Sequence, residues 1–177
     1  MIMLQNLFRP RPRERLGEAL YDLAVRQARD PAFYTTMGVA DRIDARFELY
    51  TLHVLLLVMR LRDEDERGAE TAQLLFDTYV SALDHALREL GVGDISVGKK
   101  MRKLGEALYG RMSTYEPPLR EGDAPTLAAG LARNVFESAE AETGDALAAY
   151  ALASRDRLAA QDLAGVTTRP DWAEIRA

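Results

Sequence analysis

The chain has no cysteine among its 177 residues, and it is also poor in aromatic side chains, long apolar runs and net positive charge. Without cysteine it can form neither a disulfide nor a thiolate metal site, and thiol-based catalysis is excluded. The aromatic content of 7% and the abundance of alanine, leucine, arginine and glutamate favour helices over strands. The net charge of −5 argues against a general affinity for nucleic-acid phosphates.

No apolar segment is long enough to cross a membrane as a helix. The longest, around residues 49–59, falls well short of the roughly 20 residues that a span requires. At the N-terminus the apolar residues precede the arginines, which is the reverse of a secretion signal. This order is compatible with contact at an anionic membrane surface or with packing on the domain itself. The expected membrane-contact residues are Leu4, Leu7, Phe8, Arg9 and Arg11.

What the sequence does have is helical periodicity, with apolar residues recurring every three or four positions through most of its length. Residues 47–62 are apolar on nearly all sides, which predicts a central buried helix. We therefore expect an all-α fold: one compact domain of about six to seven helices. Its expected parts are an apolar and basic segment at 1–14, a helical core at 15–115, and alanine-rich helices with a tail at 116–177. A linker is expected at 116–125, where proline and glycine concentrate.

Residues 93–100 read Gly-x-x-x-x-Gly-Lys-Lys, which differs by one residue from a nucleotide-binding P-loop. A P-loop follows a strand, whereas helical periodicity precedes this segment, and Lys100 occupies the place of the hydroxyl residue that binds magnesium. The segment instead predicts a turn between two helices. Gly91 suits the left-handed end of the first helix, and Asp94 or Ser96 suits the cap of the second.

The sign of the charge reverses across this turn. Residues 63–90 carry eight acidic and two basic side chains, whereas residues 91–111 carry two acidic and five basic ones. Such blocks usually form solvated faces, and a docking surface for a charged partner is the alternative.

The titratable residues form no recognisable catalytic or metal-binding pattern. His53 and His85 lie on different expected helices, and neither a Glu-x-x-His nor a His-x-x-x-His spacing occurs. No serine lies in a Gly-x-Ser-x-Gly setting. Because His53 interrupts the most apolar stretch, we expect it to be a hydrogen-bonded core residue. We expect no enzymatic activity, metal or cofactor.

Two sets of charges are expected to organise the helices. Asp84 precedes Arg88 by four residues, which predicts an ion pair along one helix. Arg46 lies near a helix start, where the helix dipole disfavours a cation. Asp77, Asp84 or Glu48 is expected to compensate it, and a role for these charges in binding a partner is the alternative.

Three segments carry a long, ordered pattern of these residues: DARFELYTLHVLLLVMRL (44–61), LFDTYVSALDHALRELGVGD (75–94) and KKMRKLGEALYGR (99–111). Together they resemble the ubiquinol–cytochrome c chaperone family, over about residues 15–115. Gly98 departs from the proline expected there in many relatives. The long N-terminal extensions of mitochondrial members are missing, so the chain resembles a bacterial member.

The resemblance implies a non-catalytic assembly chaperone that binds newly made cytochrome b of ubiquinol–cytochrome c reductase. It would work in the bacterial cytoplasm, peripherally at the inner membrane and without ATP, through an apolar groove with a charged rim. The groove is expected between the helices around 44–60 and 75–111. The expected partner-binding residues are Asp44, Arg46, Phe47, Glu48, Asp77, Asp84, Arg88, Asp94, Lys99, Lys103, Tyr109 and Arg111.

Two other functions remain open at this point. A haem-handling or other small-ligand-binding helical protein could use His53, His85 and methionine side chains as ligands. A scaffold could dimerise through the alanine-rich C-terminal helices. The sequence does not specify an oligomeric state.

Overall fold

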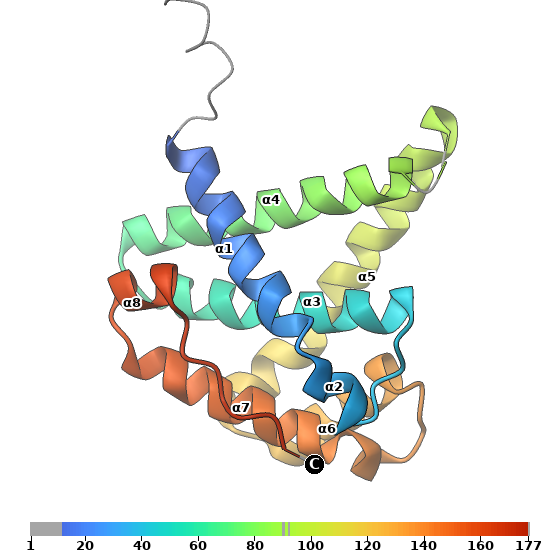
Figure 1. The fold of residues 1–177 in the computed structure, drawn as a ribbon, viewed down its shortest axis with the longest axis vertical. Helices are drawn as coiled ribbons and strands as arrows, with labels where there is room; N and C mark the ends of the chain where they lie inside the picture. The colour runs from blue at the N-terminus through green and yellow to red at the C-terminus, as the bar shows by residue number, and fades with distance from the viewer. Residues whose placement is uncertain (1–11, 90, 92, 177) are drawn as a thin grey trace, which may run out of the picture.

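A computed structural model describes residues 12–89, 91 and 93–176, apart from the side chains of residues 12–14, 94 and 95. Its elements are all helical (Figure 1): α1 Pro12–Ala28, α2 Pro31–Thr35, α3 Ile43–Arg62, α4 Glu66–Glu89, α5 Asp94–Glu121, α6 Ala124–Val135, the 3₁₀ helix η1 Ala141–Gly144, α7 Asp145–Ala160 and α8 Leu163–Thr168. The described residues contain no strand, so the predicted all-α fold is confirmed. The P-loop interpretation fails for the same reason, because a helix precedes Gly93.

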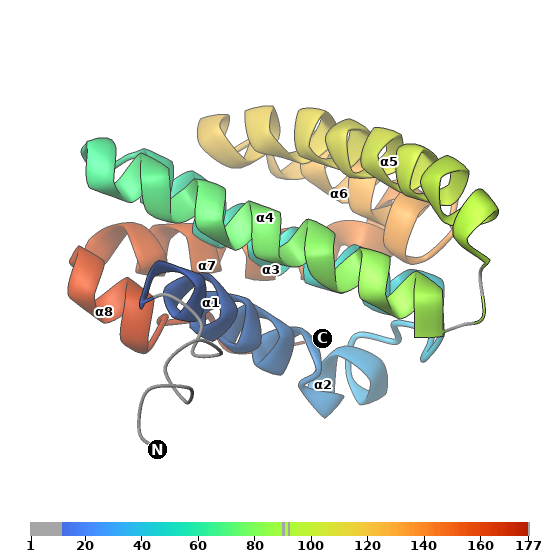
Figure 2. The same cartoon turned by 90° about the horizontal axis from the view of Figure 1, so that it is seen from above.

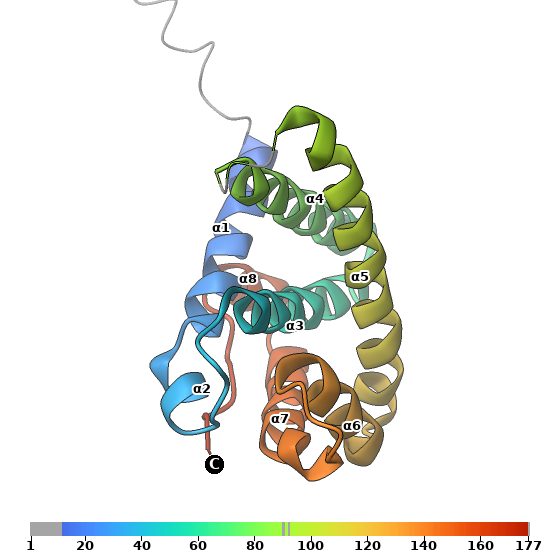
Figure 3. The same ribbon diagram turned by 90° about the vertical axis from the view of Figure 1, so that its right-hand side faces the viewer.

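Helix α3 lies at the centre of the molecule. Figure 3 shows it between α4 on one side and α6 and α7 on the other, with α1 and α5 flanking it, and it contacts all five of these helices. Every residue of α3 from Glu48 to Met59 is buried except Tyr50. The predicted central helix is therefore confirmed. An apolar helix can be covered on all sides only when its neighbours enclose it.

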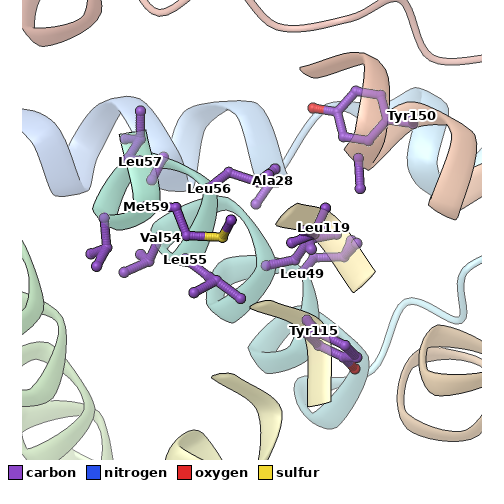
Figure 4. Close-up of a cluster of buried hydrophobic side chains, with 14 of the residues drawn as sticks. Ala28, Leu49, Val54, Leu55, Leu56, Leu57, Met59, Tyr115, Leu119 and Tyr150 are labelled. Carbon is purple, nitrogen blue, oxygen red and sulfur yellow. The ribbon is translucent and has the colours of Figure 1, made fainter. Parts of the chain in front are cut away.

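The core is one continuous cluster built around α3. Figure 4 shows Leu49, Leu55 and Leu56 of α3 beside Tyr115 and Leu119 from α5 and Tyr150 from α7. Fully burying each leucine stabilises the fold by roughly 1.5–3 kcal/mol. The C-terminal helices thus share a core with the N-terminal ones.

Helices α4 and α5 form a hairpin whose turn projects from the rest of the molecule (Figures 1 and 2). Gly91 has a φ of 78°, the left-handed conformation predicted for the end of the first helix. The expected cap of the second helix by Asp94 or Ser96 is wrong. Gly93 occupies the N-cap position and has no side chain with which to accept the free amides.

Helix α5 continues through the region expected to be a linker. Pro117 and Pro118 lie inside it, and it ends only at Gly122, whose φ is 75°. Proline removes a helical hydrogen bond and disfavours a helix interior. Here burial of the last turns outweighs that cost, because Tyr115 and Leu119 are completely buried.

The C-terminal segment folds back against α3. Trp172 packs edge-on against His53, with 5.1 Å between the ring centroids, and the amide of Ala173 donates a 3.1 Å hydrogen bond to Ser154 Oγ of α7. The tail expected at the end of 116–177 is therefore docked on the domain through Trp172.

No helix in the described part of the chain is both long and apolar enough to cross a bilayer. The five expected membrane-contact residues, Leu4 to Arg11, lie outside the described residues.

Candidate functional site

A groove opens where α3, α4, α5 and the end of α6 meet. Its volume is about 490 Å³. It is lined by Ile43, Asp44, Phe47, Glu48, Leu83, Ala86, Leu87, Leu104, Arg111, Arg133, Asn134 and Glu137. The groove lies between the two segments from which the sequence predicted it, with α6 as an additional wall.

The walls of the groove are mainly apolar. Leu83 and Leu87 lie one turn apart on α4 and face the groove together with Leu104 of α5 and Phe47 of α3. Ile43, at the first turn of α3, is 70% exposed, which is unusual for so large an apolar side chain. An exposed apolar surface bordered by charges is typical of a protein-binding site.

Glu48 and Arg111 form an ion pair at the groove. The Arg111 Nη2 atom lies 2.7 Å from Glu48 Oε1, and Arg111 Nε lies 2.9 Å from both carboxylate oxygens. The Glu48 side chain is only 5% exposed and that of Arg111 28%. Burial raises the pKa of Glu48, and the hydrogen bonds from Arg111 offset part of this increase. The carboxylate in turn raises the pKa of Arg111.

Further charges border the groove. Arg42 pairs with Glu137 at 2.8 Å, and Asn134 Nδ2 donates a 2.9 Å hydrogen bond to the Tyr115 hydroxyl. Asp44 and Arg133 are exposed and form no ion pair with any residue that the structure describes. The rim therefore offers a carboxylate and a guanidinium that no described residue neutralises.

Four of the twelve expected partner-binding residues come together in this groove: Asp44, Phe47, Glu48 and Arg111. Nothing in the sequence distinguished Arg133, Asn134 and Glu137, because α6 lies far along the chain from α3. Leu83, Leu87 and Leu104 were visible as apolar positions, but helical spacing does not separate a groove wall from a core face.

The other expected partner-binding residues on α3 and α4 lie elsewhere. Arg46 pairs with Asp41 at 2.7 Å, so the expected compensation by Asp77, Asp84 or Glu48 is wrong. Asp41, which lies just before α3, forms the ion pair with Arg46, while Glu48 points inward and pairs with Arg111. Asp77 accepts a hydrogen bond from Gln73.

The predicted Asp84–Arg88 pair is present at 2.8 Å. Together with His85 it lines a second hollow of about 540 Å³ between α4 and the start of α5.

The remaining predicted residues belong to α5. Lys99, Lys103 and Tyr109 are exposed on its surface and do not line the groove. Asp94 begins α5, but its side chain lies outside the described residues.

His53 is a buried hydrogen-bonded residue, as predicted. Its Nδ1 lies 2.7 Å from the Leu49 carbonyl oxygen, so Nδ1 donates, and Nε2 accepts from the Tyr150 hydroxyl at 2.8 Å. Burial lowers the pKa of His53 to about 4. Both ring nitrogens are occupied, so His53 has no free atom for a haem iron, and the described residues contain no cluster of three or more potential metal ligands.

Comparison with known proteins identifies the family. The model of the ubiquinol–cytochrome c chaperone family matches residues 35–172. The chain belongs to this family. The match contains every residue that lines the groove and extends through α6 and α7, beyond the segments that carry the resemblance in the sequence.

One solved structure is closely similar to this chaperone. It is described as the crystal structure of the Cbp3 homolog from Brucella abortus, with 32% sequence identity, coverage of 98% of both chains and a TM-score of 0.82. No curated protein matches the chain. Family and structure together support a role as a ubiquinol–cytochrome c chaperone.

Proposed function

We propose that the chain is a non-catalytic assembly chaperone that holds an apolar helix of newly made cytochrome b in the groove between α3, α4, α5 and α6. The observation that carries this proposal is an apolar, charge-bordered groove in a member of the ubiquinol–cytochrome c chaperone family. Cytochrome b is a membrane subunit, so its helices need a protected surface before they are inserted and assembled.

The shape of the groove suits the face of a helix. A volume of about 490 Å³ accommodates several large side chains but not a whole folded domain. Helices bind such grooves by inserting side chains at positions i, i+3, i+4 and i+7, which follow one face. Leu83 and Leu87 of α4 and Leu104 of α5 provide apolar contacts for these anchors.

The charges would select and orient the bound segment. Asp44 can pair with a basic residue at one end of the guest helix, and Arg133 can pair with an acidic residue or with free carbonyls at its C-terminus. The Glu48–Arg111 pair satisfies its own charges, so the guest need not neutralise a buried ion. Release would then depend on competition from the assembling membrane complex and not on ATP. This proposal places the chaperone peripherally at the inner membrane.

A pair of groove substitutions tests the proposal. Cytochrome b is produced in detergent together with one of three tagged forms of the chaperone: the wild type, the groove variant Ile43→Ser/Leu87→Ser, or the variant Tyr109→Ser. Tyr109 is an expected partner-binding residue that is also large and exposed, at 75%, but it lies outside the groove, so its variant compares the α5 surface with the groove as the client site. We expect the groove variant to recover at least about tenfold less cytochrome b than the wild type does, because two apolar anchors are lost.

The Tyr109→Ser control is expected to recover as much cytochrome b as wild type. Equal recovery by the folded groove variant would contradict the groove as the client site. Adding Lys99→Glu/Lys103→Glu to the series tests the expected partner-binding role of these lysines. Unchanged recovery from that variant would remove them from the client surface.

A further inference from the structure

The outward surface of α5 carries a compact group of basic side chains that the groove does not use. Lys99, Arg102, Lys103 and Tyr109 are all exposed, and their spacing places them on one side of the helix. The exposed Glu106 lies on the same side, so three cations and one carboxylate give this side a net charge of +2. We call Lys99, Arg102, Lys103 and Tyr109 the α5 outer face. Ten residues of helix separate its ends, which gives a length of about 15 Å.

This face points away from the rest of the molecule. Figure 3 shows α5 along one side of the structure, with α3 and α4 on its inner side. Val97 and Leu108 are buried on that inner side of the helix, and Leu104 and Arg111 face the groove. A ligand on the α5 outer face therefore leaves the groove free for a client.

The three cations of this face have no described partner. Elsewhere most arginines form ion pairs, for example Arg60 with Glu64 at 2.6 Å and Arg120 with Asp63 at 3.0 Å. None of Lys99, Arg102 and Lys103 forms an ion pair or a side-chain hydrogen bond with another residue in the described ranges. The basic charge is thus available to an external anion.

We propose that the α5 outer face binds the headgroups of an anionic phospholipid membrane. Its cations and its exposed tyrosine follow one nearly straight stretch of helix, which can lie along a plane. Lysine and arginine reach the phosphates on long flexible stems, while tyrosine favours the interface between water and hydrocarbon. Because the tyrosine lies a full two turns from Arg102, the helix would contact the surface along its length and not only at its tip.

A membrane fits these features better than a nucleic acid does. The neighbouring helix α4 and its preceding loop carry the acidic residues of 63–90, eight acidic against two basic side chains. A nucleic acid wrapping around the hairpin would meet this acidic surface, whereas a plane touching only the outer side of α5 avoids it.

The test uses the full chain without cytochrome b, so its result does not depend on the proposed client. Flotation is measured with vesicles of phosphatidylcholine alone and with vesicles containing about one-third phosphatidylglycerol. Wild type is expected to float only with the anionic vesicles, and less so as salt rises. Neutralising the face with Lys99→Gln/Arg102→Gln/Lys103→Gln is expected to weaken this binding on the order of 100-fold.

Two control variants isolate position and charge. Arg26→Gln/Arg67→Gln/Arg169→Gln removes the same charge from exposed positions elsewhere and is expected to retain wild-type binding. Lys99→Arg/Arg102→Lys/Lys103→Arg keeps the charge of the face and should also bind like wild type.

Several outcomes would overturn the proposal. The first is equal binding of the wild type to neutral and anionic vesicles. The second is an equal loss of vesicle binding in the α5 variant and in the position control. The third is full vesicle binding by the α5 variant, which would place the membrane contact elsewhere, such as in the N-terminal segment. Binding of a short RNA through these residues without any vesicle binding would identify a nucleic-acid surface instead.

Discussion

His53 couples the stability of the protein to pH because it is buried as a neutral ring. In the unfolded chain a histidine takes up a proton below about pH 6.5, whereas burial lowers the pKa of His53 in the folded protein to about 4. The folded state is therefore favoured above pH 6.5, and this stabilisation is lost as the pH falls towards 4. The free energy of unfolding should decrease by about 3 kcal/mol across this window through His53 alone.

The substitution His53→Gln tests this linkage, since glutamine can form hydrogen bonds but does not titrate. Urea unfolding between pH 7.5 and 4 should show a weaker acid-dependent loss in this variant. At neutral pH it should be less stable by about 1–2 kcal/mol, because the bonds to Leu49 and Tyr150 change. His85 is exposed, and His85→Gln should keep the wild-type pH profile. If His53→Gln kept the wild-type pH dependence of unfolding, groups other than His53 would be responsible for the loss of stability in acid.

The Glu48–Arg111 pair predicts a second effect at the scale of single residues. Replacing Arg111 with methionine leaves a buried carboxylate without its partner, and at pH 7 this should destabilise the protein by about 3 kcal/mol. The cost should shrink as the pH falls and Glu48 becomes protonated. The double variant Glu48→Leu/Arg111→Met should recover much of the stability. A double variant no more stable than Arg111→Met would refute the role assigned to the unpaired charge.

At the scale of elements, glycines mark where helices touch and where they do not. A β-carbon at Gly144 would collide with the backbone carbonyl of Ala128, where η1 crosses α6. Beyond the adjacent backbone of α5 itself, no described atom lies within 4 Å of such a carbon at Gly105, in the middle of that helix. The two positions therefore form a matched pair for one substitution.

Gly144→Ala should destabilise the protein by about 3 kcal/mol, since η1 and α6 must separate. Gly105→Ala should stabilise it by about 0.5–1 kcal/mol, because alanine favours an open helical position. Thermal denaturation of both variants gives the comparison. A Gly144→Ala variant as stable as the wild type would mean that α6 and η1 readjust to accept the added methyl group.

The elements also show why some predictions from sequence succeeded. Helix α3 was predictable because thirteen of its residues are buried and most of these are apolar. Its own sequence therefore shows that it is a core helix, whatever packs against it. The continuation of α5 through Pro117 and Pro118 was not predictable, because it depends on packing against α6 and α7. Local signals describe a residue's own preferences, and contacts between distant elements can override them.

For the whole molecule, the central position of α3 predicts a gradient of local stability. Amides within α3 are covered by neighbours on all sides, so their hydrogen exchange should require global unfolding. Amides near the turn of the α4–α5 hairpin, such as those of 96–100, should exchange through smaller openings, because these residues are mostly exposed. Hydrogen-exchange mass spectrometry measures both, and equal protection would contradict this gradient.

The candidate site also depends on contacts between distant helices, which the sequence alone does not predict. The sequence placed Asp44, Phe47, Glu48 and Arg111 among the partner-binding residues, but it could not show that they meet. It also missed the wall provided by α6, because helical periodicity describes each helix alone and gives no crossing angle or neighbour. The three-dimensional packing of four helices, and not any local motif, creates the groove.

The docking of the C-terminal segment has a practical consequence. Trp172 is the only tryptophan in the sequence, and its ring rests against His53 in the centre of the fold. The protein therefore contains its own optical reporter. A red shift in its fluorescence would signal that the C-terminal segment has detached and the indole has entered water, and following that signal during client capture would show whether the chaperone loosens as it works.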